Sequence, residues 1–311
     1  MSAAAERHAE ILKLARLLGR DPGTIAYMAE VPAADIRELR EQVAEVLFSA
    51  SHVTLGRLAA ASRLLPVGLV AKIGEHAFGP VLSARIAGML DPGRAMEMAG
   101  KLPVGFLAEV AMNIDPRRAS DVIARVPARQ VAQITAELAR REEYVAMGRF
   151  VAYLPPEGIA AAVEAMDDEA LLRVAFVLES KERLHELVSL LPEARIDGIL
   201  DAAARAHLWM EALDLLANLD DSQRREFAKR TGTRDAGVVD SLVQSARELE
   251  LWPTLLPLAA DLEPEAQERV ADSVRKLDLE ASERERVLDY ARTQGLLDGL
   301  GPLLRAVEGG G

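Results

Sequence analysis

Few side chains in this sequence have a type and spacing that could do chemistry. The histidines are His8, His52, His76, His185 and His207. No two of them lie four residues apart, the spacing with which one face of a helix presents a pair of metal ligands. Glu75 precedes His76, but adjacent residues on a helix point in different directions. We therefore expect an ordinary surface pair there and not a catalytic dyad.

Acidic clusters are the other candidate ligands. Asp167, Asp168 and Glu169 stand together, as do Asp220 and Asp221. Each cluster opens a predicted helix, where free backbone N–H groups and the helix dipole favour carboxylates. We interpret them as helix caps, and predict no catalytic residue, no metal site and no cofactor.

Other catalytic motifs are missing from the sequence. The glycines of residues 295–304 follow no predicted strand, so they do not form a phosphate-binding loop, and no Gly-x-Ser-x-Gly elbow is present. The chain has no cysteine, which excludes disulfides, thiolate zinc sites and cysteine nucleophiles and fits a reducing cytosol. We predict that the protein is not an enzyme.

Charge and hydropathy narrow the classes of partner. The net charge is -12, which disfavours nucleic acid because phosphate binding depends on clustered Lys and Arg. The longest fully apolar run, residues 64–71, contains Pro66 and is far shorter than the roughly 18 residues that span a bilayer. Glu6 and Glu10 interrupt the apolar pattern at the start, unlike a signal peptide. We expect a cytoplasmic protein, at most peripheral at the membrane, with no transmembrane segment.

The elements that position these residues are predicted to be short helices in repeats. Residues 89–104 align without a gap on residues 113–128, 24 residues later. Asp-Pro pairs at 91–92 and 115–116 can supply a capping carboxylate and a proline at the first helical position. Behind each pair, apolar residues follow the spacing of one buried helical face. Those residues are Ala95, Met98, Ala99 and Leu102 in the first copy and Ala119, Val122, Ile123 and Val126 in the second.

Prolines after an apolar residue mark further helix starts. They are Pro32, Pro66, Pro103, Pro127, Pro155 and Pro192. Because proline ends one helix and favours the start of the next, the chain should change direction at each. With Ala and Leu abundant and only 4% aromatic residues, we expect helices and no strands.

A longer repeat occupies the C-terminal part. Residues 197–219 match 240–262 with an offset of 43, set by Trp209 and Trp252, and a weaker copy lies at 285–307. Periods of 40–47 residues with two helices each are typical of HEAT-like arrays. We expect the two tryptophans to pack between helices, and residues 231–237 to form a loop.

The predicted fold is all-α, an α-solenoid or superhelical array of short helix pairs. We divide it into an N-terminal helical segment at 1–50, short-helix repeats at 51–190, HEAT-like repeats at 191–307 and a disordered tail at 308–311.

The phrases Leu-Asp-Pro-x-Arg-Ala and Leu-Pro at 90–103, with their counterparts at 114–127, resemble a known family. They are similar to the intracellular N domain of MgtE-type magnesium transporters and the middle segments of flagellar motor switch proteins. The resemblance covers about half the chain and implies a right-handed superhelix of short helices. It does not imply magnesium transport, because the sequence has neither the nucleotide-binding pair nor the membrane domain of those transporters. No metal ligands are carried over, since Asp91 and Asp115 are explained as caps.

The leading functional prediction is a non-enzymatic interaction or scaffold protein that binds a polypeptide partner. The alternative is an apolar-ligand (lipid) or membrane-surface protein, suggested by residues 51–90, where Glu75 is the only carboxylate. We favour interpreting that stretch as the most buried repeat. A helical-repeat hydrolase or glycosylase is a third, disfavoured alternative.

Comparison of the 24-residue copies suggests where a partner or ligand binds. The earlier copy has Met89, Met96 and Phe106 where the later copy has Asn113, Ser120 and Gln130. If the later positions are solvated, the earlier copy exposes an adaptable apolar patch. In the alternative, which we favour, a helix from residues 51–88 covers it. Arg94, Arg117 and Arg118 could also grip an acidic partner, although arginine near a helix start is usually solvated.

Overall fold

A computed structural model describes residues 3–49, 52–179, 181, 184–189 and 191–309. These residues form α-helices, with a few 3₁₀ and π turns, and contain no strand. The predicted all-α fold class is therefore confirmed for the described part of the chain.

Contacts divide the chain into two compact units. The N-terminal unit is Arg7–Ser180, and the C-terminal unit is Lys181–Gly311 together with Met1–Glu6. The divisions predicted from the sequence, after residues 50, 190 and 307, stay a prediction.

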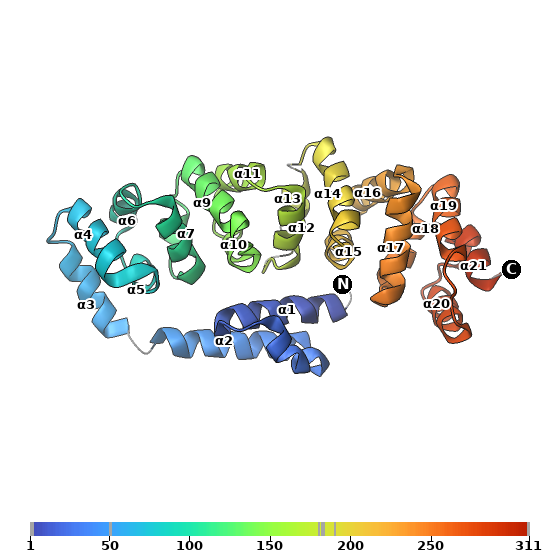
Figure 1. The fold of residues 1–311 in the computed structure, drawn as a ribbon, viewed down its shortest axis with the longest axis horizontal. Helices are drawn as coiled ribbons and strands as arrows, with labels where there is room; N and C mark the ends of the chain where they lie inside the picture. The colour runs from blue at the N-terminus through green and yellow to red at the C-terminus, as the bar shows by residue number, and fades with distance from the viewer. Residues whose placement is uncertain (1–2, 50–51, 180, 182–183, 190, 310–311) are drawn as a thin grey trace. The chain divides into compact units, whose positions relative to one another are not determined.

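From Arg7 onward, the N-terminal unit begins with two long helices joined by a short one. These are α1 (Ala3–Leu18), η1 (Pro22–Glu30) and α2 (Ala33–Ser49). Figure 1 shows α1 and α2 side by side, and a cluster of buried apolar residues lies between them: Ile11, Leu14, Ala15, Ile25 and Ile36. The side chain of Asp21 accepts a hydrogen bond from the Gly23 N–H at 2.8 Å, as expected of a cap, but the helix that follows is 3₁₀.

Shorter helices make up the rest of the N-terminal unit. They are α3 (His52–Ser62), α4 (Val67–Ile73), the π-helical η2 (Gly74–Phe78), α5 (Gly79–Ala87), α6 (Pro92–Ala99), α7 (Val104–Asn113), α8 (Ser120–Ile123), α9 (Ala128–Arg140), α10 (Tyr144–Phe150), α11 (Pro156–Glu164) and α12 (Asp168–Phe176). Alternate helices pack together, α5 on α7, α7 on α9 and α9 on α11. Pro66, Pro103 and Pro127 each directly precede a helix, as predicted.

The two 24-residue copies differ at their starts. Asp91 caps α6, accepting from the Arg94 N–H at 3.1 Å, with Pro92 at the first helical position. Asp115 accepts instead from the Arg117 N–H, only two residues on, at 3.1 Å. The Asp115 carbonyl oxygen accepts from the Arg118 N–H at 3.2 Å, which closes a turn over residues 115–118, and the α-helix begins only at Ser120. The prediction that Asp115 and its proline open a helix is therefore wrong.

The segment from 51 to 90 is not the most deeply buried repeat. Among its described residues, Leu64 is 87%, Leu69 48% and Val81 53% exposed. Our preferred interpretation of this stretch is thus contradicted by the exposure of these apolar side chains.

The C-terminal unit repeats a group of three helices. Its helices are α13 (Leu184–Ser189), α14 (Glu193–Arg205), α15 (Trp209–Ala217), α16 (Asp221–Thr233), α17 (Ala236–Glu248), α18 (Trp252–Ala260), α19 (Pro264–Arg275), α20 (Ala281–Thr293), η4 (Leu297–Gly299) and α21 (Gly301–Glu308). A shift of 43 residues places α14–α16 onto α17–α19, so each repeat has three helices and not the expected two. The extra start comes from Asp220, which caps α16, and from Pro264, which opens α19.

A left-handed residue ends the first helix of each group. His207, Glu250 and Gly295 have φ of 56°, 53° and 68°. In each case the next N–H returns to the carbonyl oxygen five residues earlier, at 2.8 to 2.9 Å: Leu208 to Ala203, Leu251 to Ala246 and Leu296 to Ala291. This is the hydrogen bond of a Schellman motif, and its recurrence at the repeat period supports the alignment of the three copies.

The tryptophans and the predicted loop also have clear positions. Trp209 and Trp252 each begin a helix and are 1% and 8% exposed, so the prediction that they pack between helices is confirmed. The loop expected at 231–237 is wrong, because α16 continues to Thr233 and α17 starts at Ala236. The tail predicted from 308 overlaps α21, which ends at Glu308, while 310–311 lie outside the described residues.

Candidate binding cleft

The three residues proposed from the repeat comparison are only half-buried. Met89 and Met96 pack against a cluster of buried residues that includes Leu55 and Ala59 of α3. Phe106 is half-buried on α7. The cluster also contains Ile86 of α5, so α3 and α5, both within residues 51–88, cover the two methionines in part.

Met96 and Phe106, but not Met89, line a cavity of about 170 Å³ in the N-terminal unit. Its wall also contains the predicted buried face of the first copy: Ala95, Met98, Ala99 and Leu102. We call this the apolar cavity. Gln130, expected to be solvated, lies on the same wall, and its Nε2 donates to the Ala99 carbonyl at 3.3 Å. The first copy is therefore less buried than its pattern indicates because it borders a space.

Arg94 has a structural role near this cavity. Its Nη2 donates to the carbonyl oxygens of Ser62 and Leu65, at 2.6 Å each. These bonds tie Arg94 to the last residue of α3 and to the turn that follows it.

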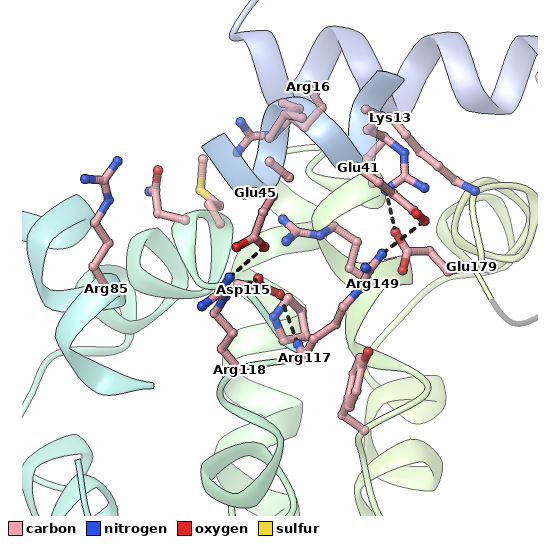
Figure 2. Close-up of a pocket in the computed structure, with 18 of the residues that line it drawn as sticks. Lys13, Arg16, Glu41, Glu45, Arg85, Asp115, Arg117, Arg118, Arg149 and Glu179 are labelled. Carbon is pink, nitrogen blue, oxygen red and sulfur yellow. Dashed lines mark hydrogen bonds and ion pairs between the residues drawn. The ribbon is translucent and has the colours of Figure 1, made fainter. Parts of the chain in front are cut away.

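A second, larger cleft of about 510 Å³ lies between α1 and α2 on one side and α5, the 115–118 turn and α10 on the other. Seven cationic side chains line it: Lys13, Arg16, Arg40, Arg85, Arg117, Arg118 and Arg149. Four carboxylates line it too: Glu41, Glu45, Asp115 and Glu179. The lining carries three more positive than negative groups, although the chain as a whole is strongly acidic. We call this the arginine cleft; Figure 2 shows ten of these residues labelled.

A buried carboxylate anchors the wall formed by α1 and α2. Glu10 is 1% exposed and lies 3.0 Å from Lys13 Nζ, 3.2 Å from Arg40 Nε and 3.4 Å from Arg37 Nε. Burial alone would oppose its charge, but Lys13, Arg40 and Arg37 together lower the pKa of Glu10 below its ordinary value. Arg40 also reaches Glu179 at 3.0 Å.

Ion pairs across the cleft join its two sides. Arg16 Nε lies 2.8 Å from Glu143 Oε2, beside α10. From α2, Glu41 reaches Arg117 at 3.4 Å and Glu45 reaches Arg118 at 2.8 Å. Ion pairs thus join α1 to the start of α10, and α2 to the turn that contains Arg117 and Arg118.

Arg149 is a cation in the cleft without a carboxylate partner among the described residues. It is half-buried on α10, and its only hydrogen bond there goes from Nη2 to the Ile114 carbonyl at 3.3 Å. Burial lowers the pKa of Arg149, and the attraction of Glu179 and Asp115 does not offset this. A partly desolvated guanidinium has five N–H donors, so it can bind a carboxylate or phosphate in two-point fashion.

Arg85 and Arg117 are two further cations of the cleft, and they differ in their partners. Arg85 of α5 also forms no ion pair within the described part of the chain. Arg117 differs: burial opposes its charge, yet Glu179, Glu41 and Asp115 raise its pKa. Within the described residues, the cleft thus holds cations that pair with a carboxylate and two, Arg85 and Arg149, that do not.

The catalytic and metal candidates have ordinary surroundings. His76 Nε2 and Glu75 Oε2 are 3.7 Å apart, too far for a hydrogen bond, and His76 is exposed. Asp167 caps α12 and Asp220 caps α16, each accepting an N–H at 2.8 Å, as predicted. Among the described residues, no three His, Cys, Asp or Glu side chains are grouped to hold a metal ion. The side chains of His52 and His185 lie outside that part.

No family model, curated protein or solved structure matches this chain. The resemblance to the MgtE N domain therefore depends on the sequence phrases alone. Within the described residues, no helix combines the length and apolarity needed to cross a membrane.

Sequence reasoning noted two of the cleft arginines, Arg117 and Arg118, and missed the others. One sequence signal could have identified Arg149. It is the single charged residue of the helix Tyr144–Phe150, whose other six residues are uncharged and mostly apolar. A long cation on such a helix indicates a partly buried charge that needs a counter-ion.

Proposed function

We propose that this protein is a non-enzymatic interaction protein that binds an acidic polypeptide segment in the arginine cleft. The observation that carries the proposal is Arg149, a half-buried guanidinium that faces the cleft and has no carboxylate partner within the described residues. Holding such a charge is unfavourable for the free protein, which is typical of binding sites.

The other cleft residues favour a polypeptide over nucleic acid. Apolar side chains, among them Leu17, Val81, Met112 and Val145, line the cleft together with the arginines. Mixed apolar and arginine-rich surfaces are typical of protein interfaces. Four carboxylates in the lining and the net charge of -12 would repel the dense charge of a nucleic acid.

Calorimetric titration tests the proposal. The probe is an alanine-based peptide of about 18 residues, long enough to be partly helical, that carries three glutamates at successive turns. We expect binding that weakens with salt, is at least about tenfold weaker for Arg149→Gln with Arg85→Gln, and is absent for the same peptide with glutamines.

The chain offers a matched control for those substitutions. Arg125 and Arg129 are exposed in the same unit and do not line the cleft. The variant Arg125→Gln with Arg129→Gln loses the same charge and should bind as the wild type does. Equal losses in both double variants, no peptide binding at all, or tighter binding of a duplex DNA of similar charge would contradict the proposal.

A second candidate function, binding of an apolar ligand such as a lipid, is favoured by the apolar cavity. Mainly apolar side chains line its volume of about 170 Å³, and Leu64 and Leu69, which lie in the sequence between the lining residues Ser62 and Val70, are exposed. A neutral naphthylamine dye should fluoresce on binding there, and Ala99→Leu, which fills the cavity, should abolish the signal. If Arg149→Gln abolishes it equally, the dye does not report this cavity.

The same proposal includes the architecture and location. Packing of alternate helices within each unit and the three aligned Schellman motifs support a repeat array of the solenoid class, with HEAT-like units in the C-terminal part. The MgtE-like phrases support a short-helix superhelix in the N-terminal unit. A cytoplasmic location fits the lack of cysteine.

A further inference from the structure

Two carboxylates of the chain itself already reach into the arginine cleft. Glu41 and Glu45 of α2 contact Arg117 and Arg118, with N–O distances of 3.4 and 2.8 Å. The two glutamates are four residues apart, so they project from one face of the helix. In Figure 2 they lie on the α2 side of the cleft, opposite the two arginines.

We propose that the cleft recognises a partner helix with two carboxylates one turn apart, and that α2 is an internal competitor for it. This inference rests on the proposed function and adds the geometry of the partner and a means of regulation. The consecutive arginines of the 115–118 turn would exchange the glutamates of α2 for those of the partner.

The pairs made by α2 are of a kind that exchanges readily. The side chains of Arg117, Glu41 and Glu45 are 53%, 46% and 68% exposed. Ion pairs in water contribute little, because solvent screens them and two long side chains must be ordered. A partner that also neutralises Arg149, which α2 does not reach with a carboxylate in the described structure, has an additional interaction available.

The α2 helix can release these arginines without leaving its place. Its position depends on other contacts, chiefly Arg40 with buried Glu10 and with Glu179. Ile36 of α2, which is fully buried, also packs against Ile11 and Leu14 of α1. Loss of the two exposed pairs therefore leaves the α1–α2 core intact.

The test is the variant Glu41→Gln with Glu45→Gln, titrated with an alanine-based peptide of about 18 residues carrying two glutamates four residues apart. We expect its affinity to rise about three- to tenfold over the wild type, since two weak competing pairs are removed. A peptide with the glutamates two residues apart, on different faces, should gain less. Thermal unfolding should stay close to the wild type.

A matched variant separates competition from a general change in charge. Asp35→Asn with Glu38→Gln removes two charges from exposed positions of the same helix that do not line the cleft. It should leave the affinity unchanged. If both double variants gain equally, or neither gains while binding still depends on Arg149, the competitor role of α2 is wrong and the proposed function stands. If neither the wild type nor either variant binds the peptide, both proposals fail.

Discussion

Arg149 is the residue on which the proposed binding role depends most. Since burial lowers its pKa, the folded protein without a ligand holds this charge at a cost. We expect Arg149→Met to raise the free energy of unfolding by about 1 kcal/mol, while peptide binding is lost. Urea unfolding followed by circular dichroism measures the first effect. A destabilised variant would show that the guanidinium supports the fold, and would count against a ligand-binding role.

At Glu10, in contrast to Arg149, the surroundings stabilise the charged form, because three cations surround the buried carboxylate. Its pKa in the folded state is lowered, so its ionisation stabilises the fold above the unfolded pKa of about 4.3, and this contribution is lost as the pH falls through the folded value. Glu10→Gln leaves Lys13 buried without its partner, so we expect a loss of about 3 kcal/mol at pH 7.

The pH dependence of that loss provides the check. The difference in unfolding free energy between Glu10→Gln and the wild type should shrink below about pH 4, where the wild-type carboxyl also becomes protonated. A difference that stays constant from pH 7 to pH 3 would mean that charge at Glu10 is not what stabilises α1 and α2.

At this scale the sequence predicted local interactions better than distant ones. Asp91, Asp167 and Asp220 are caps, as their place before a helix indicated. Arg149 could not be assigned, because its surroundings come from Arg16, Arg40 and Asp115, which are remote from it in the sequence.

At Gly232, helix α16 packs closely against α19. A Cβ on Gly232 would lie 2.5 Å from the Cβ of Ala266. We expect Gly232→Ala to destabilise the C-terminal unit by about 1 to 3 kcal/mol, because the helices must separate. Both tryptophans, Trp209 and Trp252, lie in this unit, so tryptophan fluorescence in urea reports its unfolding.

Gly237 is the control for that substitution. A Cβ there would meet no described atom within 4 Å, and the residue lies in the first turn of α17. Gly237→Ala should be neutral or stabilising by up to about 1 kcal/mol. Equal effects of the two substitutions would contradict the close packing of α16 on α19.

The left-handed residues at the repeat junctions make another prediction. Glu250 has the same conformation as Gly295, but only glycine adopts it without steric cost. We expect Glu250→Gly to stabilise the C-terminal unit by up to about 1 kcal/mol, and Gly295→Ala to destabilise it by a similar amount. Stabilisation by Gly295→Ala in the same fluorescence assay would show that the junctions are not Schellman motifs.

Helix starts were the most predictable feature of the elements. Pro103 and Pro127 precede α7 and α9 because proline fixes φ and lacks an N–H that a first turn does not need. The loop expected at 231–237 failed for a different reason. Gly232 resembles a helix breaker in the sequence, whereas its role is to let another helix approach, which only the tertiary contact reveals.

On the scale of the whole molecule, the sequence predicted the fold class but not the cleft. Periodicity and composition are local properties, so they indicated helices throughout. The arginine cleft combines residues from Lys13 to Glu179, and its excess of positive charge is hidden in a chain of net charge -12. The comparison of repeat copies selected Met89, Met96 and Phe106 instead, because it detects only differences between aligned positions. It could not show that Met96 and Phe106 border the apolar cavity.

Hydrogen–deuterium exchange of the full chain, with and without the glutamate peptide, tests the central claim most directly. We expect the peptide to slow exchange in residues 112–118 and 145–153, which contribute Arg117, Arg118 and Arg149 to the cleft. Exchange in α15 and α18 of the C-terminal unit should not change. Protection confined to the C-terminal unit or to α6 beside the apolar cavity, with none at 112–118 and 145–153, would contradict the arginine cleft as the binding site.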